Sequence, residues 1–214
     1  MKKIKLKICG LCYSDNVYEV LKINPDFIGF IFFEGSPRFV GNHYGWIRNL
    51  NIGPYVNKVA VFVNETAERI IEISEKTNVQ YIQLHGNEPP ELCSALTNKG
   101  LKLIKVFSVG EDFSFKMMED YIGIVDYFLF DTKGKYLGGS GISFDWNLIE
   151  KYPFNIPFFL SGGIGIENIS NIRQLNNPML YAVDVNSKLE SSPGIKDSVK
   201  LGKFKEEFEK LQYD

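Results

Sequence analysis

Eight short apolar segments recur along the chain, and they constrain its fold more than any other feature. Most are continuous rather than alternating, and they are rich in Val, Ile and Phe. Continuous apolar segments of this length are typical of strands buried on both faces, which favours a parallel sheet. The segments are 5–9, 27–32, 58–63, 81–84, 102–107, 127–130, 158–160 and 181–185.

Segments with helical periodicity separate the apolar segments. The last of them, 201–211, repeats large apolar residues at spacings of three and four, as on one face of a helix. Asn64 before Glu65 predicts a helix start with an acid in its first turn. Pro90 suits the first turn of another helix.

Strand–helix alternation eight times over predicts an α/β fold. The 214 residues give about 27 per unit, slightly compact for a (β/α)8, or TIM, barrel. The alternative, a doubly wound open sheet, normally carries G-x-G-x-x-G after its first strand. Here the first strand runs into Cys9-Gly10-Leu11-Cys12 instead. We predict a single-domain barrel over 1–214, with its weakest helices at 43–50 and 111–121.

Composition excludes several classes of protein. Hydrophobic residues make up 44%, enough for a full core, and the net charge of -2 gives no reason to expect nucleic acid or an anionic membrane as partner. No apolar segment approaches the ~20 residues that span a bilayer, and the N-terminus lacks the apolar region of a signal peptide. Three cysteines are sparse for a disulfide framework. We expect a reduced, cytoplasmic protein that is a monomer.

The ends of the predicted strands carry reactive side chains. In a barrel the active site lies at the carboxyl ends of the strands. Those ends supply the thiol of Cys9, the guanidinium of Arg38, the imidazole of His85 and the carboxylates of Asp131 and Asp184. A chance selection of strand ends would be poorer in such groups, so we predict an active site here.

Cys9 and Cys12 also form a C-x-x-C pair. A redox role needs a thioredoxin-like context, and a zinc site needs two further ligands. Cys93, His43 and His85 lack a recognisable ligand spacing. The plainest alternative for Cys9 is a small buried hydrophobe, but its place at a strand end favours a chemical role.

Three other strand-end residues have two readings each. Asp131 follows the apolar segment 128–130, so we expect desolvation to raise its pKa and keep it available as an acid; alternatively it accepts hydrogen bonds in a turn. His85 can bind a ligand or a loop carbonyl. Arg38 follows Pro37 in a stiffened loop, where its guanidinium can clamp a carboxylate; alternatively it is a solvated surface residue.

Glycines cluster after the later strands. Ser161-Gly162-Gly163-Ile164-Gly165 leads into a helix expected near Glu167, and backbone amides at such a turn bind phosphate. Together with Asn186 and Ser187, after the eighth strand, they fall on the phosphate site that many barrels share. The glycine-rich segment 133–143 can close as a lid.

In this order, the motifs resemble those of the phosphoribosylanthranilate isomerases, tryptophan-pathway enzymes with a (β/α)8 fold. The resemblance covers nearly the whole chain. The matching motifs are Lys7-Ile8-Cys9-Gly10, Gly29-Phe30, Ser36-Pro37-Arg38, Val61-Phe62-Val63-Asn64, Gln83-Leu84-His85-Gly86, Asp131-Thr132, Gly138-Gly139-Ser140-Gly141, Phe144-Asp145-Trp146, Ser161-Gly162-Gly163-Ile164, Asp184-Val185-Asn186-Ser187 and Pro193-Gly194-Ile195-Lys196-Asp197.

The resemblance implies an Amadori rearrangement of N-(5-phosphoribosyl)anthranilate, a small phosphosugar, with no cofactor and no metal. It implies Cys9 as general base and Asp131 as general acid. It also implies that Arg38 holds the anthranilate carboxylate and that Asp184 lies beside the substrate. A free thiol has a pKa of ~8.5, so a cysteine base benefits from a lowered pKa. Lys7 lies two residues earlier, and the sequence leaves open whether it supplies that effect.

The chain departs from the family pattern at two places. Lys188-Leu189 stands where Gly-Val is usual, which bears on the phosphate loop, and Ile142 stands where a basic residue is common, which bears on a lid contact. Three other functions compete: the histidine-pathway aminoaldose isomerase, a catalytically silent phosphate-binding barrel and a C-x-x-C thiol oxidoreductase. The first has a carboxylate in place of Cys9, and the second would lack the acid and base present here.

Overall fold

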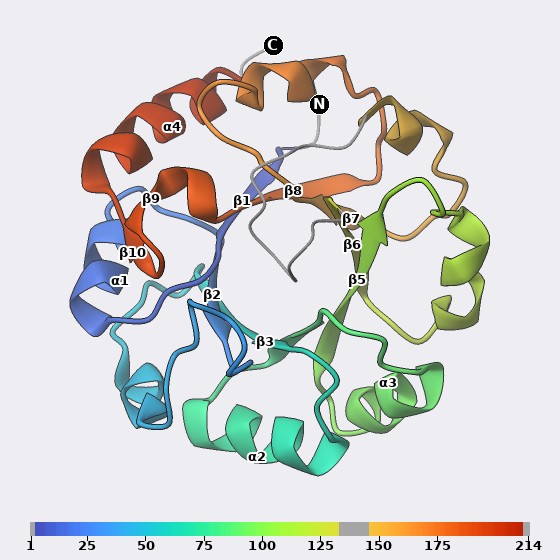
Figure 1. The fold of residues 1–214 in the computed structure, drawn as a ribbon, viewed down its shortest axis with the longest axis horizontal. Coiled ribbons are helices and arrows are strands. Elements are labelled where there is room, and N and C mark those ends of the chain that lie inside the picture. The colour runs from blue at the N-terminus through green and yellow to red at the C-terminus, as the bar shows by residue number, and fades with distance from the viewer. Residues whose placement is uncertain (1–2, 133–145, 212–214) are drawn as a thin grey trace.

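The structure, a computed structural model, describes residues 3–132 and 146–211. Eight parallel strands close into a barrel in chain order, and β1 pairs with β8 (Figure 1). This confirms the predicted TIM barrel, and each predicted segment forms a strand whose ends differ by at most two residues. The strands are β1 Lys5–Ile8, β2 Phe27–Ile31, β3 Asn57–Phe62, β4 Tyr81–Leu84, β5 Lys102–Val109, β6 Tyr127–Thr132, β7 Phe158–Leu160 and β8 Leu180–Val185.

The strands separate two apolar layers, because successive side chains point to opposite faces. Phe128 and Phe130 belong to the outer layer beneath the surrounding helices. Leu129, between them in sequence, belongs to the inner layer. The inner layer consists of Phe27, Val59, Ile104, Val106, Leu129, Phe159 and Ala182. The barrel is therefore filled by side chains rather than open along its axis.

In the part of the chain that the structure describes, half of the strand connections expected to be α-helical contain 3-10 helices instead. The α-helices are α1 Ser14–Leu21, α2 Ala67–Thr77, α3 Pro90–Thr97 and α4 Ser198–Lys210, and they surround the barrel (Figure 1). The 3-10 helices in the other connections are η1 Tyr44–Asn49, η2 Phe115–Tyr121, η3 Trp146–Lys151 and η4 Ile169–Gln174. Gly45 interrupts η1, and η4 is rich in Ile, Ser and Asn, so both segments have low helix propensity.

The helix starts correct one prediction and confirm another. Thr66, rather than Asn64, caps α2, and its hydroxyl accepts from the backbone N–H of Arg69. Asn64 instead adopts φ 51°, and its side-chain oxygen accepts from the backbone N–H of Asn87 at 2.6 Å. A short polar side chain tolerates this left-handed conformation. Helix α3 begins at Pro90, as predicted.

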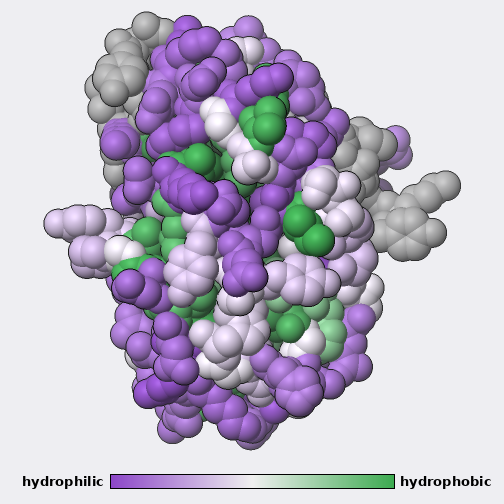
Figure 2. Space-filling view, turned by 90° about the vertical axis from the view of Figure 1, so that its left-hand side faces the viewer, coloured by the Kyte–Doolittle hydropathy of each residue, from purple (hydrophilic) through white to green (hydrophobic). Residues whose placement is uncertain are grey.

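A small hairpin follows β8 and packs beside α1 and α4. It consists of η5 (Ser187–Leu189), then β9 (Glu190–Ser192) and β10 (Ile195–Lys196), which pair antiparallel. The face that carries α1, α4 and this hairpin is mostly hydrophilic, with hydrophobic residues in small separate groups (Figure 2). Across 3–132 and 146–211, no helix has both the length and the apolarity needed to cross a membrane.

Candidate active site

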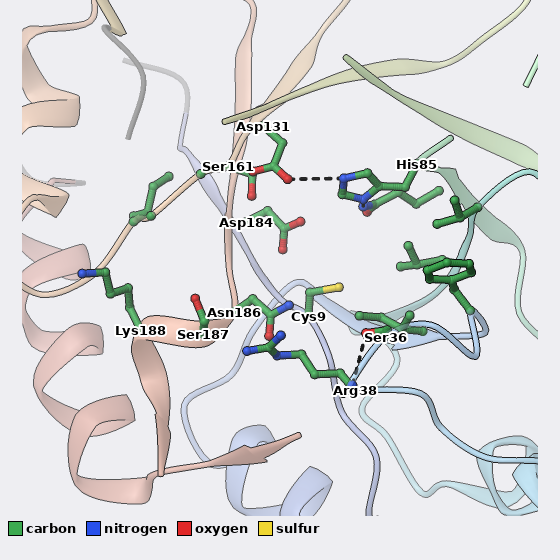
Figure 3. A pocket seen from close by; sticks show the side chains of 18 residues that line it. Cys9, Ser36, Arg38, His85, Asp131, Ser161, Asp184, Asn186, Ser187 and Lys188 are labelled. Carbon is green, nitrogen blue, oxygen red and sulfur yellow. Dashed lines mark hydrogen bonds and ion pairs between the residues drawn. The ribbon is translucent and has the colours of Figure 1, made fainter. Parts of the chain in front are cut away.

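One pocket opens among the loops that follow the barrel strands, and every predicted site residue lines it (Figure 3). The strands therefore bring together side chains that are up to 178 positions apart in the sequence. The predicted residues that line it are Cys9, Arg38, His85, Asp131, Gly162, Gly163, Asp184, Asn186 and Ser187.

The two-residue period of the strands explains why polar groups reach this pocket. Leu129 belongs to the inner apolar layer, so Asp131, two residues later, also faces the barrel interior. Ala182 and Asp184 repeat the relation on β8. Polar residues thus form a layer directly above the apolar filling of the barrel.

Cys9 follows β1 and is held at the pocket floor. Its backbone N–H donates to the carbonyl of Val185 at 2.9 Å, and its side chain is 4% exposed. A Cβ added at Gly29 would lie 2.7 Å from the sulfur, so the glycine leaves room for the thiol. Burial raises the pKa of Cys9, and the charge of Lys7 opposes that rise. The resting group is therefore a thiol beside a cation.

Lys7 is a component of the site that sequence reasoning left open. It pairs in register with Asp184 on the neighbouring strand, and its Nζ lies 2.6 Å from Asp184 Oδ2 with both side chains buried. Burial raises the pKa of Asp184, against the effect of Lys7. Burial disfavours the Lys7 ammonium, but the charges of Asp184 and Cys9 outweigh it, so the pKa of Lys7 is raised. The signal in the sequence was a lysine on the same face of the strand as Cys9, two residues away.

Two buried acceptors that line the pocket have no hydrogen-bond partner in the described part of the chain. They are Asp184 Oδ1 and Gln83 Oε1. Buried polar atoms are nearly always paired in folded proteins. These two atoms therefore point to a polar ligand that donates hydrogen bonds. Gln83 was missed from the sequence, although it faces inward two residues before His85.

Asp131 and His85 face each other across the pocket rim (Figure 3). His85 Nε2 lies 3.3 Å from Asp131 Oδ2, and its Nδ1 lies 3.3 Å from Gln83 Nε2. Asp131 Oδ1 also accepts from the backbone N–H of Thr132 at 2.9 Å. The carboxylate thus combines the two predicted readings, an acceptor in the turn and a group presented to the pocket. Within the described residues, His85 contacts this carboxylate rather than a loop carbonyl.

Arg38 is buried at 8% exposure, so the reading of it as a solvated surface residue is wrong. Its guanidinium forms a fork with Glu190 on β9. Nε lies 2.9 and 3.0 Å from the two carboxylate oxygens, and Nη2 lies 2.7 Å from Oε2. A carboxylate clamp is therefore present, although the clamped group belongs to the chain itself. Glu190 was also missed from the sequence.

A glycine turn after β7 forms the other end of the pocket. Gly162 and Gly163 have φ of 93° and 66°, a region that L side chains rarely adopt. Asn168 fixes the turn, accepting from the N–H of Gly165 at 2.8 Å and donating to the carbonyl of Gly163 at 2.9 Å. The helix expected near Glu167 begins at Ile169 and is a short 3-10 helix. Anion binding here would therefore depend on the turn's amides rather than on an α-helix dipole.

Lys188 adds a cation to this end of the pocket. Its side chain lines the pocket, and its Nζ lies 2.8 Å from Glu167 Oε1, with both side chains partly exposed. The hydrogen bond from Lys188 lowers the pKa of Glu167. The predicted lid, including Gly138 to Gly141, and the departure at Ile142 lie outside the described residues.

The C-x-x-C reading gains no support from the surroundings of the two thiols. Cys12 Sγ donates to the carbonyl of Arg38 at 3.2 Å and lies outside the pocket lining. Burial raises the pKa of Cys12 to about 11, and it raises the pKa of Cys9 as well. Redox-active C-x-x-C motifs instead contain a thiol of lowered pKa. No group of three His, Cys, Asp or Glu side chains in 3–132 or 146–211 could hold a metal ion.

Comparison with known proteins places this chain in a family. The family model for N-(5'-phosphoribosyl)anthranilate isomerase matches residues 6–207. The enzyme of that name from Parabacteroides distasonis is 42% identical over 202 residues, covering 93% of this chain and 90% of the relative. The phosphoribosyl anthranilate isomerase of Thermotoga maritima superposes with a TM-score of 0.85 at 30% identity, covering 97% and 99% of the two chains. A further structure of such an isomerase, solved with reduced 1-(o-carboxyphenylamino)-1-deoxyribulose 5-phosphate, superposes with a TM-score of 0.82 at 29% identity, covering 97% and 99%. Because the family model and these relatives cover nearly the whole of it, the chain belongs to the N-(5'-phosphoribosyl)anthranilate isomerase family.

Proposed function

We propose that this chain converts N-(5'-phosphoribosyl)anthranilate into 1-(2-carboxyphenylamino)-1-deoxyribulose 5-phosphate, an aminoaldose–ketose isomerisation of tryptophan biosynthesis. The observation that carries the proposal is a single pocket that holds a buried thiol and a buried carboxylate, Cys9 and Asp131, on different strands. Asp184 is seen between them in Figure 3. Two separated proton-transfer groups suit a reaction that moves protons at different atoms of one sugar.

The first step in this proposal is ring opening by Asp131. Its carboxylic acid gives a proton to the furanose oxygen and becomes a carboxylate. The bond from that oxygen to C1 breaks, and the nitrogen lone pair forms the C1–N double bond of an iminium ion. The contacts of the carboxylate with His85 and with the N–H of Thr132 hold it in one orientation. Fixed orientation of this kind lowers the entropic cost of proton transfer.

The second step is proton removal from C2 by Cys9. The electron pair of the C2–H bond forms a C1–C2 double bond, and the iminium nitrogen becomes a neutral amine. The enol then becomes the ketone as C1 takes up a proton and the C2 hydroxyl loses one, so no electrons are gained or lost. Lys7, paired with Asp184, supports the thiolate that this step needs.

Substrate binding completes the proposal. Arg38 is the group that would hold the anthranilate carboxylate, and His85 and Asp184 lie where the sugar would bind. The phosphate would bind the backbone amides of the glycine turn at Gly162 and Gly163, together with Asn186 and Ser187. The reaction as written uses no cofactor and no metal.

The test is loss of anthranilate-type fluorescence when freshly prepared phosphoribosylanthranilate meets the pure protein. Product should form at a rate proportional to protein concentration, and dithiothreitol should not alter that rate. A protein that binds the product analogue but leaves the fluorescence unchanged would instead be a silent phosphosugar-binding barrel. A rate that depends on a thiol oxidant or reductant would favour the oxidoreductase reading.

We also propose the domain organisation, the oligomeric state and the cellular location of the protein. The pairing of β1 with β8 within one barrel supports a single domain over 1–214. We propose a monomer, to be tested by light scattering after size-exclusion chromatography, and a cytoplasmic location, to be tested by cell fractionation.

A further inference from the structure

The carboxylate of Glu190 pairs with Arg38, which lines the pocket, but Glu190 itself is not part of the pocket lining. The Glu190 side chain is 4% exposed. Besides the fork with Arg38, its Oε1 accepts from Lys196 Nζ at 2.7 Å and from the N–H of Gly194 at 3.1 Å. All of these donors are fixed by the hairpin of β9 and β10 or by the loop after β2. Glu190 therefore joins two segments, the loop after β2 and the hairpin after β8, which follow the two strands that flank β1.

The charges of this cluster leave Arg38 able to bind an anion. Hydrogen bonds from Arg38 and the charge of Lys196 lower the pKa of Glu190, although burial opposes them, so Glu190 is ionised near neutral pH. Burial lowers the pKa of Lys196, against the effect of Glu190. With Lys196 protonated, two cations face one carboxylate and the cluster keeps a net positive charge. With Lys196 neutral, the cluster is neutral and Arg38 still presents its donors.

The backbone and the side chain of Arg38 are both held in place. Its N–H donates to Ser36 Oγ at 3.1 Å, and its carbonyl accepts from Cys12 at 3.2 Å. A Cβ added at Gly10 would lie 2.7 Å from Arg38 Cδ, so the side chain passes directly over the glycine. Within the described residues, every hydrogen bond of the guanidinium goes to Glu190, through Nε and Nη2. Both Nη1 protons and the second Nη2 proton have no acceptor among the described residues, so they are the donors that remain for a ligand.

We propose that Glu190 is a positioning residue that fixes the guanidinium of Arg38 for the carboxylate on the substrate's aromatic ring. This rests on the proposed function, in which Arg38 binds that carboxylate. Binding is tighter when a charged side chain is already held in its bound orientation, because less conformational freedom is lost. Without Glu190, the guanidinium would rotate away from its fork and the cost of orienting it would be paid on each binding event.

The test compares two ligands that differ only in the carboxyl group. The first is reduced 1-(o-carboxyphenylamino)-1-deoxyribulose 5-phosphate, and the second is the same compound with an unsubstituted phenyl ring. Calorimetry gives the dissociation constant of each, and their ratio reports recognition of the carboxylate. We expect a ratio of roughly 10 to 100 in the wild type, the range for a charged hydrogen bond, and a ratio near 1 in Arg38→Met.

Glu190→Gln should lower this ratio by about tenfold, while affinity for the ligand without a carboxyl stays within about twofold. In the Arg38→Met background, Glu190→Gln should leave the ratio unchanged, because Glu190 acts through Arg38. Glu88→Gln is the matched control: Glu88 is also buried and pairs with a lysine, Lys105, at 2.9 Å, but it does not line the pocket. It should lower stability and keep the wild-type ratio.

The outcomes separate this inference from the proposed function. If a folded Glu190→Gln protein has the same ratio of dissociation constants as the wild type, the positioning role of Glu190 is overturned, while the assignment of Arg38 is kept. Equal loss of affinity for both ligands overturns the positioning role too, since it would indicate a general structural role. If the ratio measured in the wild-type protein is itself near 1, both the assignment of Arg38 and this inference are overturned. If Glu190→Gln does not fold, Glu190→Asp, which withdraws the carboxylate by one methylene, is measured in the same way and must also lower the ratio.

Discussion

At the scale of single residues, the site depends on a thiol in an unfavourable place for ionisation. Cys9 is buried, and burial raises the pKa of a thiol because the charged form is desolvated. A base must be present as thiolate to take a proton. Lys7, on the same face of β1 and ion-paired with Asp184, opposes the effect of burial most, and the charge of Lys196 acts in the same direction. The residues around Cys9 thus matter to its role as much as the thiol itself.

The role of Cys9 is tested against the other two thiols. Cys9→Ala removes the proposed general base, so we expect kcat to fall by roughly 10²–10⁴-fold, the usual contribution of such a group. Cys12→Ala and Cys93→Ala, whose thiols lie outside the pocket lining, should keep most of the activity. Steady-state kinetics of the three variants, each with a circular-dichroism spectrum, make the comparison. Near-full activity of Cys9→Ala would remove it from the mechanism.

Substitution of Lys7 is expected to shift the pH dependence of kcat/KM. An adjacent ammonium favours the thiolate, so its removal in Lys7→Met raises the pKa of Cys9 further above its ordinary value. The rise of kcat/KM with pH should move to higher pH, and activity at pH 7 should fall by at least about tenfold. Lys5→Met is the control, because Lys5 pairs with Asp26 at the other end of β1 and does not line the pocket. Profiles of wild type and Lys7→Met that superimpose would exclude this role.

A substitution of Asp131 can distinguish its two possible roles, general acid and hydrogen-bond acceptor in the turn. Asn can accept from the N–H of Thr132 as Asp131 does, but it cannot deliver a proton. Asp131→Asn should therefore fold and bind the product analogue, yet lose kcat by at least ~10²-fold. Single-turnover kinetics measure the chemical step directly. A folded variant that turns over at the wild-type rate would leave Asp131 with the structural role only.

The sequence predicted these strand-end residues but not their partners. Cys9, His85 and Asp131 follow apolar segments, so their place at the barrel mouth follows from the fold class alone. Lys7 and Asp184 are 177 positions apart, and their contact depends on the register of β1 against β8. Register in a closed barrel is set by the packing of all strands, which a local pattern does not contain.

At the scale of elements, the apolar segments were read more accurately than the connections between them. Continuous Val-, Ile- and Phe-rich segments are easily recognised in the sequence, because both faces of each strand must be apolar. Within the described residues, the connections after β2, β5, β6 and β7 contain 3-10 helices. Gly or Asn within η1, η3 and η4 lowers their helix propensity, whereas η2 contains neither residue. The hairpin of β9 and β10 was not foreseen, because its strands have only three and two residues.

Substitutions of Lys188 and Glu167, in the loops after β8 and β7, are expected to change KM in opposite directions. Lys188 lines the end of the pocket proposed to bind phosphate, and its ammonium pairs with Glu167 at 2.8 Å. Lys188→Gln should raise KM by roughly 2- to 5-fold, the range for a partly exposed ion pair, with little change in kcat. Glu167→Gln frees the ammonium and should lower KM. Both effects should shrink as salt is added. A lower KM in Lys188→Gln would show that the lysine hinders phosphate binding.

At the scale of the whole molecule, stability and chemistry belong to different parts of the barrel. The reactive groups lie above the inner layer, while most of the buried apolar surface lies between the strands and the surrounding helices. Loop residues at the carboxyl ends can therefore carry the chemistry without carrying the core. This division is also why the sequence predicted the fold and the site by independent signals, apolar segments for one and their terminal residues for the other.

Phe204 tests this division, since it is fully buried on the inner face of α4 and does not line the pocket. Phe204→Ala should lower the free energy of unfolding by about 3–5 kcal/mol, because the cavity left in the outer layer adds to the lost transfer free energy. Well below the melting temperature, kcat and KM should stay within a few-fold of wild type. Urea denaturation and steady-state kinetics at one temperature give both quantities, with Phe204→Leu as a smaller change at the same position. A folded Phe204→Ala protein whose kcat falls as far as that of Cys9→Ala would show that the helical shell controls the geometry of the site directly.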